Sequence, residues 1–339
     1  MKRLIILAIS AILFTSCEKE IEFNGEQSDP RLVINSIVDP GQRIEARISK
    51  SYFFLDINAD TQTPDDLVAT LYVNDNRIGE MTPGFDTIWE MYWPYDYQLI
   101  PIYYNDYCPQ EGDIVKITAS ANGFENVEGM TSALPKALNC PMDVEVTEWH
   151  SRYHQNYNYD IQEYEDDSVK NVWGYMTLTF TITDPNPRET NYFRLRTNRN
   201  SSMSVDENRR SISFDYDDPI FETGMTENGF FDASDLDTRS EGVFTDVLFD
   251  GSSYRLKLKV HFECEVTEDF DPDFFRVPFM VEHLSKEYYH YLNTCNQGDE
   301  YLQIWAEPIH VYSNVANGYG IVGGRNVNTF WVDLPIEEP

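Results

Sequence analysis

Histidines are the first side chains to test for metal chemistry. His150 and His154 lie four residues apart, the spacing of a metal-binding pair on a helix, but the residues around them are typical of an extended chain. The chain contains no His-Glu-x-x-His motif. We therefore predict no metal site at these histidines.

Acidic residues give a second candidate for metal binding. Asp269, Asp271 and Asp273 are spaced like the start of a calcium loop. Phe274 replaces the glycine that such a loop requires, and Met280 stands where its last carboxylate belongs. This excludes an EF-hand and leaves open a looser calcium site, built there or from Asp232, Asp235 and Asp237. We interpret both segments as solvated acidic loops and predict no cofactor.

Catalytic motifs are also missing from the sequence. It has no Gly-x-Ser-x-Gly motif, no glycine-rich phosphate loop and no paired Cys and His. With 58 Asp and Glu residues, a carboxylate pair for glycoside hydrolysis cannot be singled out. We predict no catalytic residues and a non-enzymatic protein.

Aromatic residues are the one positive chemical signal, and they gather in two segments. Tyr and Trp combine a large contact area with a polar group, which suits interfaces and flat ligands such as sugars or cyclic cofactors. Some of these rings must belong to a core, and Pro94 and Pro101 indicate that the first segment is partly loop. The candidate recognition residues are Trp89, Trp93, Tyr95 and Tyr97 in the first segment and Tyr153, Tyr157 and Tyr159 in the second.

Two tripeptides match an O-glycosylation pattern of Asp, then Ser or Thr, then an apolar residue. They are Asp86-Thr87-Ile88 and Asp167-Ser168-Val169. Patterns of three residues occur readily by chance. Thr87 and Ser168 are therefore candidate modification sites.

The N-terminus predicts export and lipidation. Residues 1–16 combine Lys2 and Arg3 with an apolar stretch that is too short to span a bilayer, which is typical of a signal peptide. Small residues before Cys17 resemble a bacterial lipobox, so we expect Cys17 to carry the lipid anchor. Residues 17–29 form an acidic tether, and the acidic residues just after Cys17 resemble a surface-export signal of lipoproteins. No later segment is long and apolar enough to cross a membrane, so we expect a soluble body held by its lipid.

The net charge limits the partners. It is −33 for the whole chain and −35 once Lys2 and Arg3 are removed with the signal peptide. Like charge repels a nucleic-acid backbone and anionic lipid, so neither is expected as an electrostatic partner.

Four cysteines remain after Cys17: Cys108, Cys140, Cys264 and Cys295. An even number in an exported protein allows two disulfides with three possible connectivities. We favour Cys108–Cys140 and Cys264–Cys295, because each pair would lie within one proposed domain. The absence of a Cys-x-x-Cys motif gives no support to zinc or thiol-redox chemistry.

Short alternating strands separated by turns must position these groups. We predict a mainly β fold with two antiparallel β-sandwich domains of Ig-like or related type, residues 30–136 and 137–339, and a short helix at Lys286 to Asn293 with Ser285 as its N-cap. Residues 135–141 form the junction, and residues 217–246 read as a long acidic loop. The clearest strands are 31–38, 43–49, 67–73, 77–81, 113–120, 127–134, 143–149, 173–183, 192–197, 211–216, 254–266, 301–312 and 326–334.

Several segments then resemble one family of Bacteroidota envelope lipoproteins, known as domain of unknown function 4249. They include SCEKEIEF at 16–23, LVINSIV at 32–38, DPNPRETNYFRL at 184–195 and WAEPIHVYSNVANGYGIVGG at 305–324. The resemblance implies an envelope lipoprotein, often associated with TonB-dependent outer-membrane transporters, and carries no catalytic residues. We expect the Asn and Gly residues of these segments to be structural, because they adopt backbone angles that other residues resist.

These observations together predict a lipid-anchored outer-membrane protein that faces the cell surface. Its expected role is a non-enzymatic ligand-binding or accessory subunit of a TonB-dependent uptake system, with an unknown ligand. Two alternatives stay open: a structural or adhesive envelope protein that uses its sandwiches as spacers, and a hydrolase with an unrecognised site.

Overall fold

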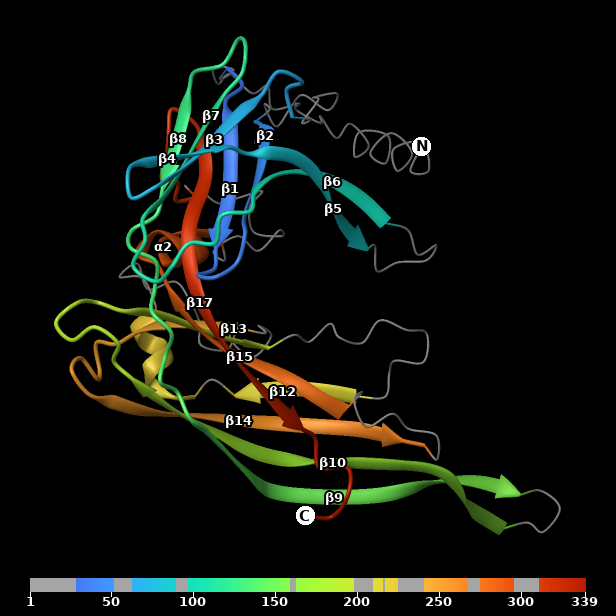
Figure 1. Ribbon diagram of the computed structural model, residues 1–339. Helices are drawn as coiled ribbons and strands as arrows, with labels where there is room; N and C mark the ends of the chain where they lie inside the picture. The colour runs from blue at the N-terminus through green and yellow to red at the C-terminus, as the bar shows by residue number, and fades with distance from the viewer. Residues whose placement is uncertain are drawn as a thin grey trace, which may run out of the picture.

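The computed structural model describes residues 29–51, 63–89, 97–158, 163–197, 210–215, 217–224, 241–267, 275–295 and 311–339. Within these ranges the protein is mainly β, as predicted (Figure 1). The elements are β1 (Leu32–Val38), β2 (Ile44–Lys50), β3 (Val68–Val73), β4 (Asn76–Glu80), β5 (Thr82–Trp89), β6 (Tyr97–Asn105), β7 (Val115–Ser120), β8 (Val127–Met130), β9 (Met142–Asn158), β10 (Glu163–Thr183), β11 (Tyr192–Thr197), β12 (Arg210–Asp215), η1 (Pro219–Gly224), β13 (Glu241–Thr245), β14 (Ser253–Val266), β15 (Arg276–Leu284), α2 (Lys286–Cys295), β16 (Val315–Ala316) and β17 (Tyr319–Asp333).

Three sheets form two stacked sandwiches. An eight-stranded sheet in the order β13-β11-β15-β17-β1-β2-β6-β5 takes part in both. A five-stranded sheet, β16-β8-β7-β3-β4, faces the β1–β2 end, and a four-stranded sheet, β12-β14-β10-β9, faces the β11–β15 end. In Figure 1 the first sandwich lies above the second.

Each sandwich has its own apolar core, built by the alternation of the strands. The side chains of β1 point alternately into the core and outward, as a half-buried strand requires. The first core joins β1, β2, β3 and β7 with residues such as Ile34 and Ile117. The second joins β10, β11, β14 and β15 around phenylalanines such as Phe193 and Phe262.

The last long strand, β17, connects the two sandwiches. Its first half pairs in parallel with β1, from Tyr319 opposite Val33 to Gly324 opposite Val38. Its second half pairs antiparallel with β15, and in Figure 1 it runs from the upper sandwich into the lower one. The chain passes from the first core, which contains Leu134, to the second core, which contains Leu138, close to the predicted boundary. The predicted C-terminal domain nevertheless gives β16 and the start of β17 to the first sandwich, and the β1–β17 pair is parallel where only antiparallel pairs were expected.

The predicted helix is confirmed as α2. The Ser285 hydroxyl accepts a hydrogen bond from the Tyr288 backbone N–H, 3.3 Å away, as an N-cap does, and a second from Gly324 N–H at 3.0 Å. The helix packs on β17 at Gly323, where a Cβ atom would lie 2.8 Å from the Tyr288 Cβ. No helix in the described ranges is long and apolar enough to span a bilayer.

Several element boundaries differ from the prediction. Strands β9 and β10 are far longer than the segments 143–149 and 173–183, and β8 is shorter than 127–134. Strands β5 and β6 cover the described ends of the first aromatic segment, and residues 90–96 between them lie outside the described residues. The predicted loop at 217–246 contains η1 and β13. Residues 301–310 of the predicted strand 301–312 lie outside the described residues.

Candidate functional site

The outer face of the four-stranded sheet carries a shallow groove of about 790 Å³. Its floor follows from strand alternation: Val172 and Met176 of β10 point into the core, so Trp173 and Tyr175 point outward. This volume lies within the range of about 300–1,000 Å³ that is usual for ligand sites. The groove is lined by Arg152, Tyr153, His154 and Gln155 of β9, Asn171 and Trp173 of β10, and His261 and Glu263 of β14.

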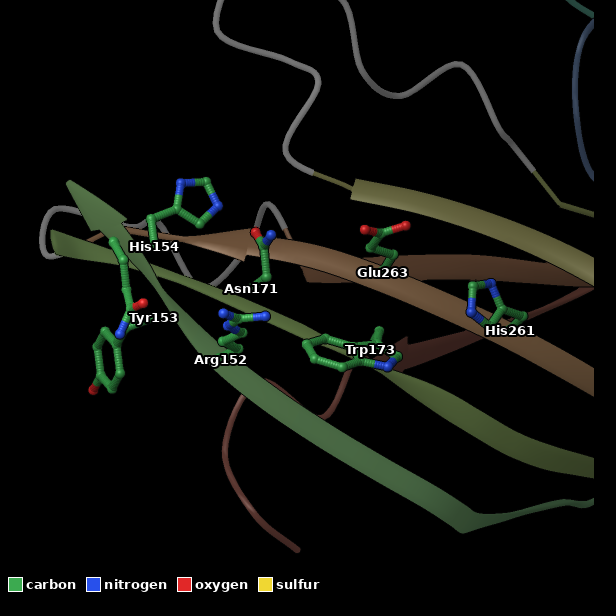
Figure 2. A pocket seen from close by; sticks show the side chains of 8 residues that line it. Arg152, Tyr153, His154, Asn171, Trp173, His261 and Glu263 are labelled. Atoms are coloured by element: carbon green, nitrogen blue, oxygen red, sulfur yellow. The ribbon is translucent and has the colours of Figure 1, made fainter. Parts of the chain in front are cut away.

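The strand register places polar side chains on both sides of Trp173. On β10, Trp173 lies opposite His150 of β9 on one side and Glu263 of β14 on the other. Arg152 lies opposite Asn171, one step further along the face. In Figure 2 the side chains of Asn171, Glu263 and His261 stand on the same side of the sheet.

Aromatic rings pair across the strands of this face. The ring of Trp173 stacks on His150 with centroids 5.6 Å apart and planes 29° apart. Tyr175 contacts His261 at 5.0 Å, and the Lys259 Nζ lies 4.4 Å from the centroid of the Tyr175 ring. Trp173 and Tyr175 are half-buried, so they present a fixed ring surface rather than mobile side chains.

The backbone beneath Trp173 is tightly packed. A Cβ atom on Gly174 would lie 2.0 Å from the Glu148 carbonyl oxygen, so only glycine lets β9 and β10 approach this closely. A register shift follows between Tyr175 and Met176. The glycine and the shift set how the Trp173 ring is aimed on the sheet.

Three polar side chains of the groove have no hydrogen-bonding partner in the described part of the chain. Within the described part of the chain, the side chains of Arg152, Asn171 and Glu263 make no hydrogen bond or ion pair. His150, by contrast, has its Nε2 2.8 Å from Glu148 Oε1. A guanidinium, an amide and a carboxylate thus have their hydrogen-bonding capacity available to a ligand.

The predicted recognition aromatics are only partly at this site. Tyr153 borders the groove and is exposed, but its ring points away from Arg152 and His154 in Figure 2. Trp149, which belongs to the second aromatic segment, instead packs against the core and donates its Nε1–H to the Pro335 carbonyl at 2.8 Å.

The remaining predicted aromatics are placed by their strands alone or lie outside the described residues. Trp89 and Tyr97 face each other in the register of β5 and β6, so both residues lie on strands. Tyr157 lies on β9. Trp93, Tyr95 and Tyr159 lie outside the described residues. Sequence reasoning missed Trp173, although its place in an alternating strand was the available signal.

The two predicted disulfides are wrong, because the four cysteines are thiols. Each predicted pair joins a buried sulfur to an exposed one: Cys140 and Cys264 lie in the second core, whereas Cys108 and Cys295 are exposed. The two buried residues are also far apart. Cys140 lies beside Thr181 to Thr183 and Cys264 opposite Val172, about ten residues along β10, or roughly 33 Å. Burial raises the pKa of the Cys140 thiol to about 12.

The other candidate sites have different outcomes. Thr87 and Ser168 are exposed on β5 and β10, so their glycosylation stays a prediction. Cys17 and the acidic candidates for calcium, Asp269, Asp271 and Asp273 with Asp232, Asp235 and Asp237, lie outside the described residues. Among the described residues, no group of three or more His, Cys, Asp or Glu side chains could hold a metal ion.

A second polar cluster lies buried where the sandwiches join. The Glu282 carboxylate has no exposed side-chain surface and meets three arginines. Arg196 Nε donates to Oε1 at 2.6 Å, and the Nη1 atoms of Arg194 and Arg325 lie 3.4 Å from the carboxylate. Arg325 also donates to Asp39 at 2.8 and 3.2 Å, which ties β17 to the turn after β1.

A third polar cluster is centred on Asn191, within segment 184–195, one of the segments that resemble the family. The Asn191 Nδ2 atom lies 2.7 Å from Asp246 Oδ2 and 3.0 Å from Asp184 Oδ1. The carbonyl oxygens of Asn186 and Glu189 are 3.2 and 3.0 Å from the same nitrogen. Burial raises the pKa of Asp246, and the hydrogen bonds from Asn191 oppose that shift. These side chains are satisfied within the protein.

The second family-like segment, at 305–324, is also structural in its described part. Asn314 Nδ2 donates to the carbonyl oxygens of Met130 and Val322, each at 2.8 Å. Gly320 has a φ of +106°, and a Cβ atom there would lie 2.1 Å from the Ile34 carbonyl oxygen. Asn317 also has a positive φ, at 60°. These Asn and Gly residues join the start of β17 to β1 and β8.

The fold and the groove define a β-sandwich protein with an open groove that contains an aromatic floor. The chain belongs to the family described as domain of unknown function DUF4249, whose model matches residues 18–330. A search of solved structures matches the crystal structure of a collagen adhesin from S. aureus, with 9% sequence identity, over 90% of this chain and 94% of that one. Its TM-score of 0.16 is too low to support an argument. A search of curated proteins found no match.

Proposed function

We propose that this protein is a lipid-anchored binding protein of the outer-membrane surface, which captures a ligand as an accessory subunit of a TonB-dependent uptake system. The observation that carries the binding role is the groove: an aromatic floor with three polar side chains that have no partner in the described part of the chain. Polar groups left uncommitted around an aromatic surface are the usual makeup of a ligand site.

The envelope location and the transporter rest on the sequence. The signal peptide, Cys17 and the acidic tether support anchoring at the cell surface, and the family resemblance supports a transporter partner. The groove supports binding rather than catalysis, because its floor is an open sheet face that does not exclude water from a bound ligand.

Affinity capture from native membranes tests the transporter. The lipidated protein is solubilised in a mild detergent, captured, and its partners are identified by mass spectrometry. We expect a TonB-dependent transporter to be recovered in near-stoichiometric amount with the native chain and to be depleted for a Cys17→Ala variant, which lacks the anchor. Recovery of no transporter with either chain would overturn the uptake role.

The alternative of a structural or adhesive envelope protein shares the anchor and the sandwiches. The continuous strand β17, which joins both cores, is the feature that favours it, because it stiffens the link between the two sandwiches. A spacer needs no intact groove. Cells that carry Trp173→Ala in place of the native chain would keep a structural function and lose a ligand-capture function.

A further inference from the structure

We infer that the groove around Trp173 binds a neutral oligosaccharide. This inference rests on the proposed binding function and names its ligand class. The first argument is the ring itself. Trp173 is half-buried and fixed against His150, so it offers a flat apolar surface on a solvent-facing sheet. The C–H faces of a sugar ring are flat and apolar, and an indole is the largest side chain on which they can stack.

The second argument is the set of polar groups around the ring. The Arg152 guanidinium only donates hydrogen bonds, the Glu263 carboxylate only accepts them, and the Asn171 amide does both. Neighbouring hydroxyls of a sugar donate and accept at adjacent atoms. All three groups are planar and bidentate, which suits such pairs of hydroxyls. A purely apolar ligand would leave these groups without partners, which costs affinity.

The third argument is charge. The formal charges of Arg152 and Glu263 cancel, so the groove has no local surplus of positive charge with which to hold an anion. The chain as a whole carries −33, and this field repels anionic ligands as they approach. A neutral ligand avoids both costs.

The shape favours a chain rather than a compact molecule. The lining residues come from three adjacent strands, β9, β10 and β14, so the groove runs across the sheet on an open face. A compact ligand would leave most of its surface in water at such a site. A chain of sugar units can repeat the same contacts along the face and recover affinity.

Isothermal titration with the purified full-length protein tests the inference. The probes are soluble fragments of neutral glucans, mannans, xylans and galactans, with polygalacturonate fragments as matched anionic sugars. We expect at least one neutral series to bind, with affinity that rises with chain length. Its Kd should change by less than about twofold between 50 and 500 mM salt, because no ion pair forms. Failure of the whole neutral panel, or binding of the anionic series alone, would overturn the inference.

Matched variants assign the binding to this groove. Trp173→Ala and Arg152→Ala should each weaken the neutral sugar at least tenfold. Trp331→Ala is the control, because Trp331 is the same large ring but lies exposed on β17, in the other sheet of the same sandwich. Equal losses in the Trp331 and Trp173 variants would place the binding elsewhere. The transporter capture is independent of these titrations: a recovered transporter without sugar binding refutes only the ligand class, and sugar binding without a transporter refutes only the uptake role.

Discussion

Two glutamates on the two sheets of the second sandwich, Glu282 and Glu263, differ in burial and in the partners of their carboxylates. Glu282 is fully buried and contacts three arginines, whereas Glu263 stands on the outer face of β14 and has no partner among the described residues. A buried carboxylate must be paired, because an isolated charge in a core is very costly. A solvent-facing carboxylate can stay unpaired until a ligand arrives. The comparison separates side chains that hold the fold from those that are available for function.

The same contrast extends to the amides. Asn191 is buried and surrounded by four oxygen atoms within 3.2 Å, more than its two hydrogens can serve at once. Asn171 lies in the groove with no side-chain hydrogen bond in the described part of the chain. The family-like segment 184–195 therefore marks a structural site, and the groove residues lie outside it.

Replacing Glu282 gives the largest effect that the comparison predicts. Glu282→Ala leaves three arginines close together in the join between the sandwiches, and breaking a buried ion pair costs about 3–5 kcal/mol. The free energy of unfolding, measured by urea denaturation, should fall by about this amount. The control is Asp333→Ala, which breaks an exposed pair with Arg276 and should cost less than about 1 kcal/mol. Equal effects in the two variants would contradict the assigned burial.

Asn191→Ala should have the next largest effect. It removes the side-chain donor shared by Asp184 and Asp246 and leaves both carboxylates with backbone N–H partners only, and losing these hydrogen bonds to charged groups costs about 2–3 kcal/mol in total. Limited proteolysis should then cut more readily near residues 184–191, because only backbone hydrogen bonds still link this segment to Asp246. If denaturation shows wild-type stability for Asn191→Ala, the segment is held by its backbone hydrogen bonds alone.

The sequence predicted the strands and the helix start, which depend on local patterns, and missed the packing of sheets, which depends on residues far apart in the chain. Alternation in residues 173–183 predicts a strand with Trp173 and Tyr175 on one face, and Ser285 predicts the start of α2. Neither pattern tells which face meets a second sheet. The groove depends on that choice, and it also needs β14, which lies far along the chain from the consecutive strands β9 and β10.

Other errors have specific physical causes. Pro101 suggested a loop, but it lies in β6 opposite Phe85 of β5. Strand β2 pairs with residues 103–105 alone, so one side of β6 is unpaired at Pro101, and a strand tolerates proline where the missing N–H faces such an open side. The parallel pairing of β17 with β1 joins residues nearly 300 positions apart, and no local pattern reports such a contact. The disulfide prediction failed because cysteine count carries no information on burial.

A pH effect should follow from His283, which is buried beside the same join. Its Nδ1 lies 2.9 Å from the Lys136 carbonyl, so the neutral ring donates there. Burial lowers its pKa below the ordinary value of 6.5. Between these two values the unfolded chain binds more protons, so stability falls as the pH drops through this window. His283→Gln should show a smaller loss of unfolding free energy between pH 7.5 and 5.5 than the native chain. Some loss should remain, because burial also lowers the pKa of His290; an unchanged pH dependence would contradict the burial of His283.

The smallest predicted effect is the stability change on Glu263→Ala, and it completes the comparison with Glu282→Ala. The substitution is the same, but Glu263 has no side-chain partner to lose among the described residues, so the free energy of unfolding should stay within about 0.5 kcal/mol of the native value. Removing a carboxylate from a chain of charge −33 even relieves some repulsion. A loss above about 2 kcal/mol in urea denaturation would show that Glu263 supports the fold, and its availability to a ligand would then be excluded. A near-zero change, set beside the large loss at Glu282, is the result expected of a carboxylate that the fold does not use.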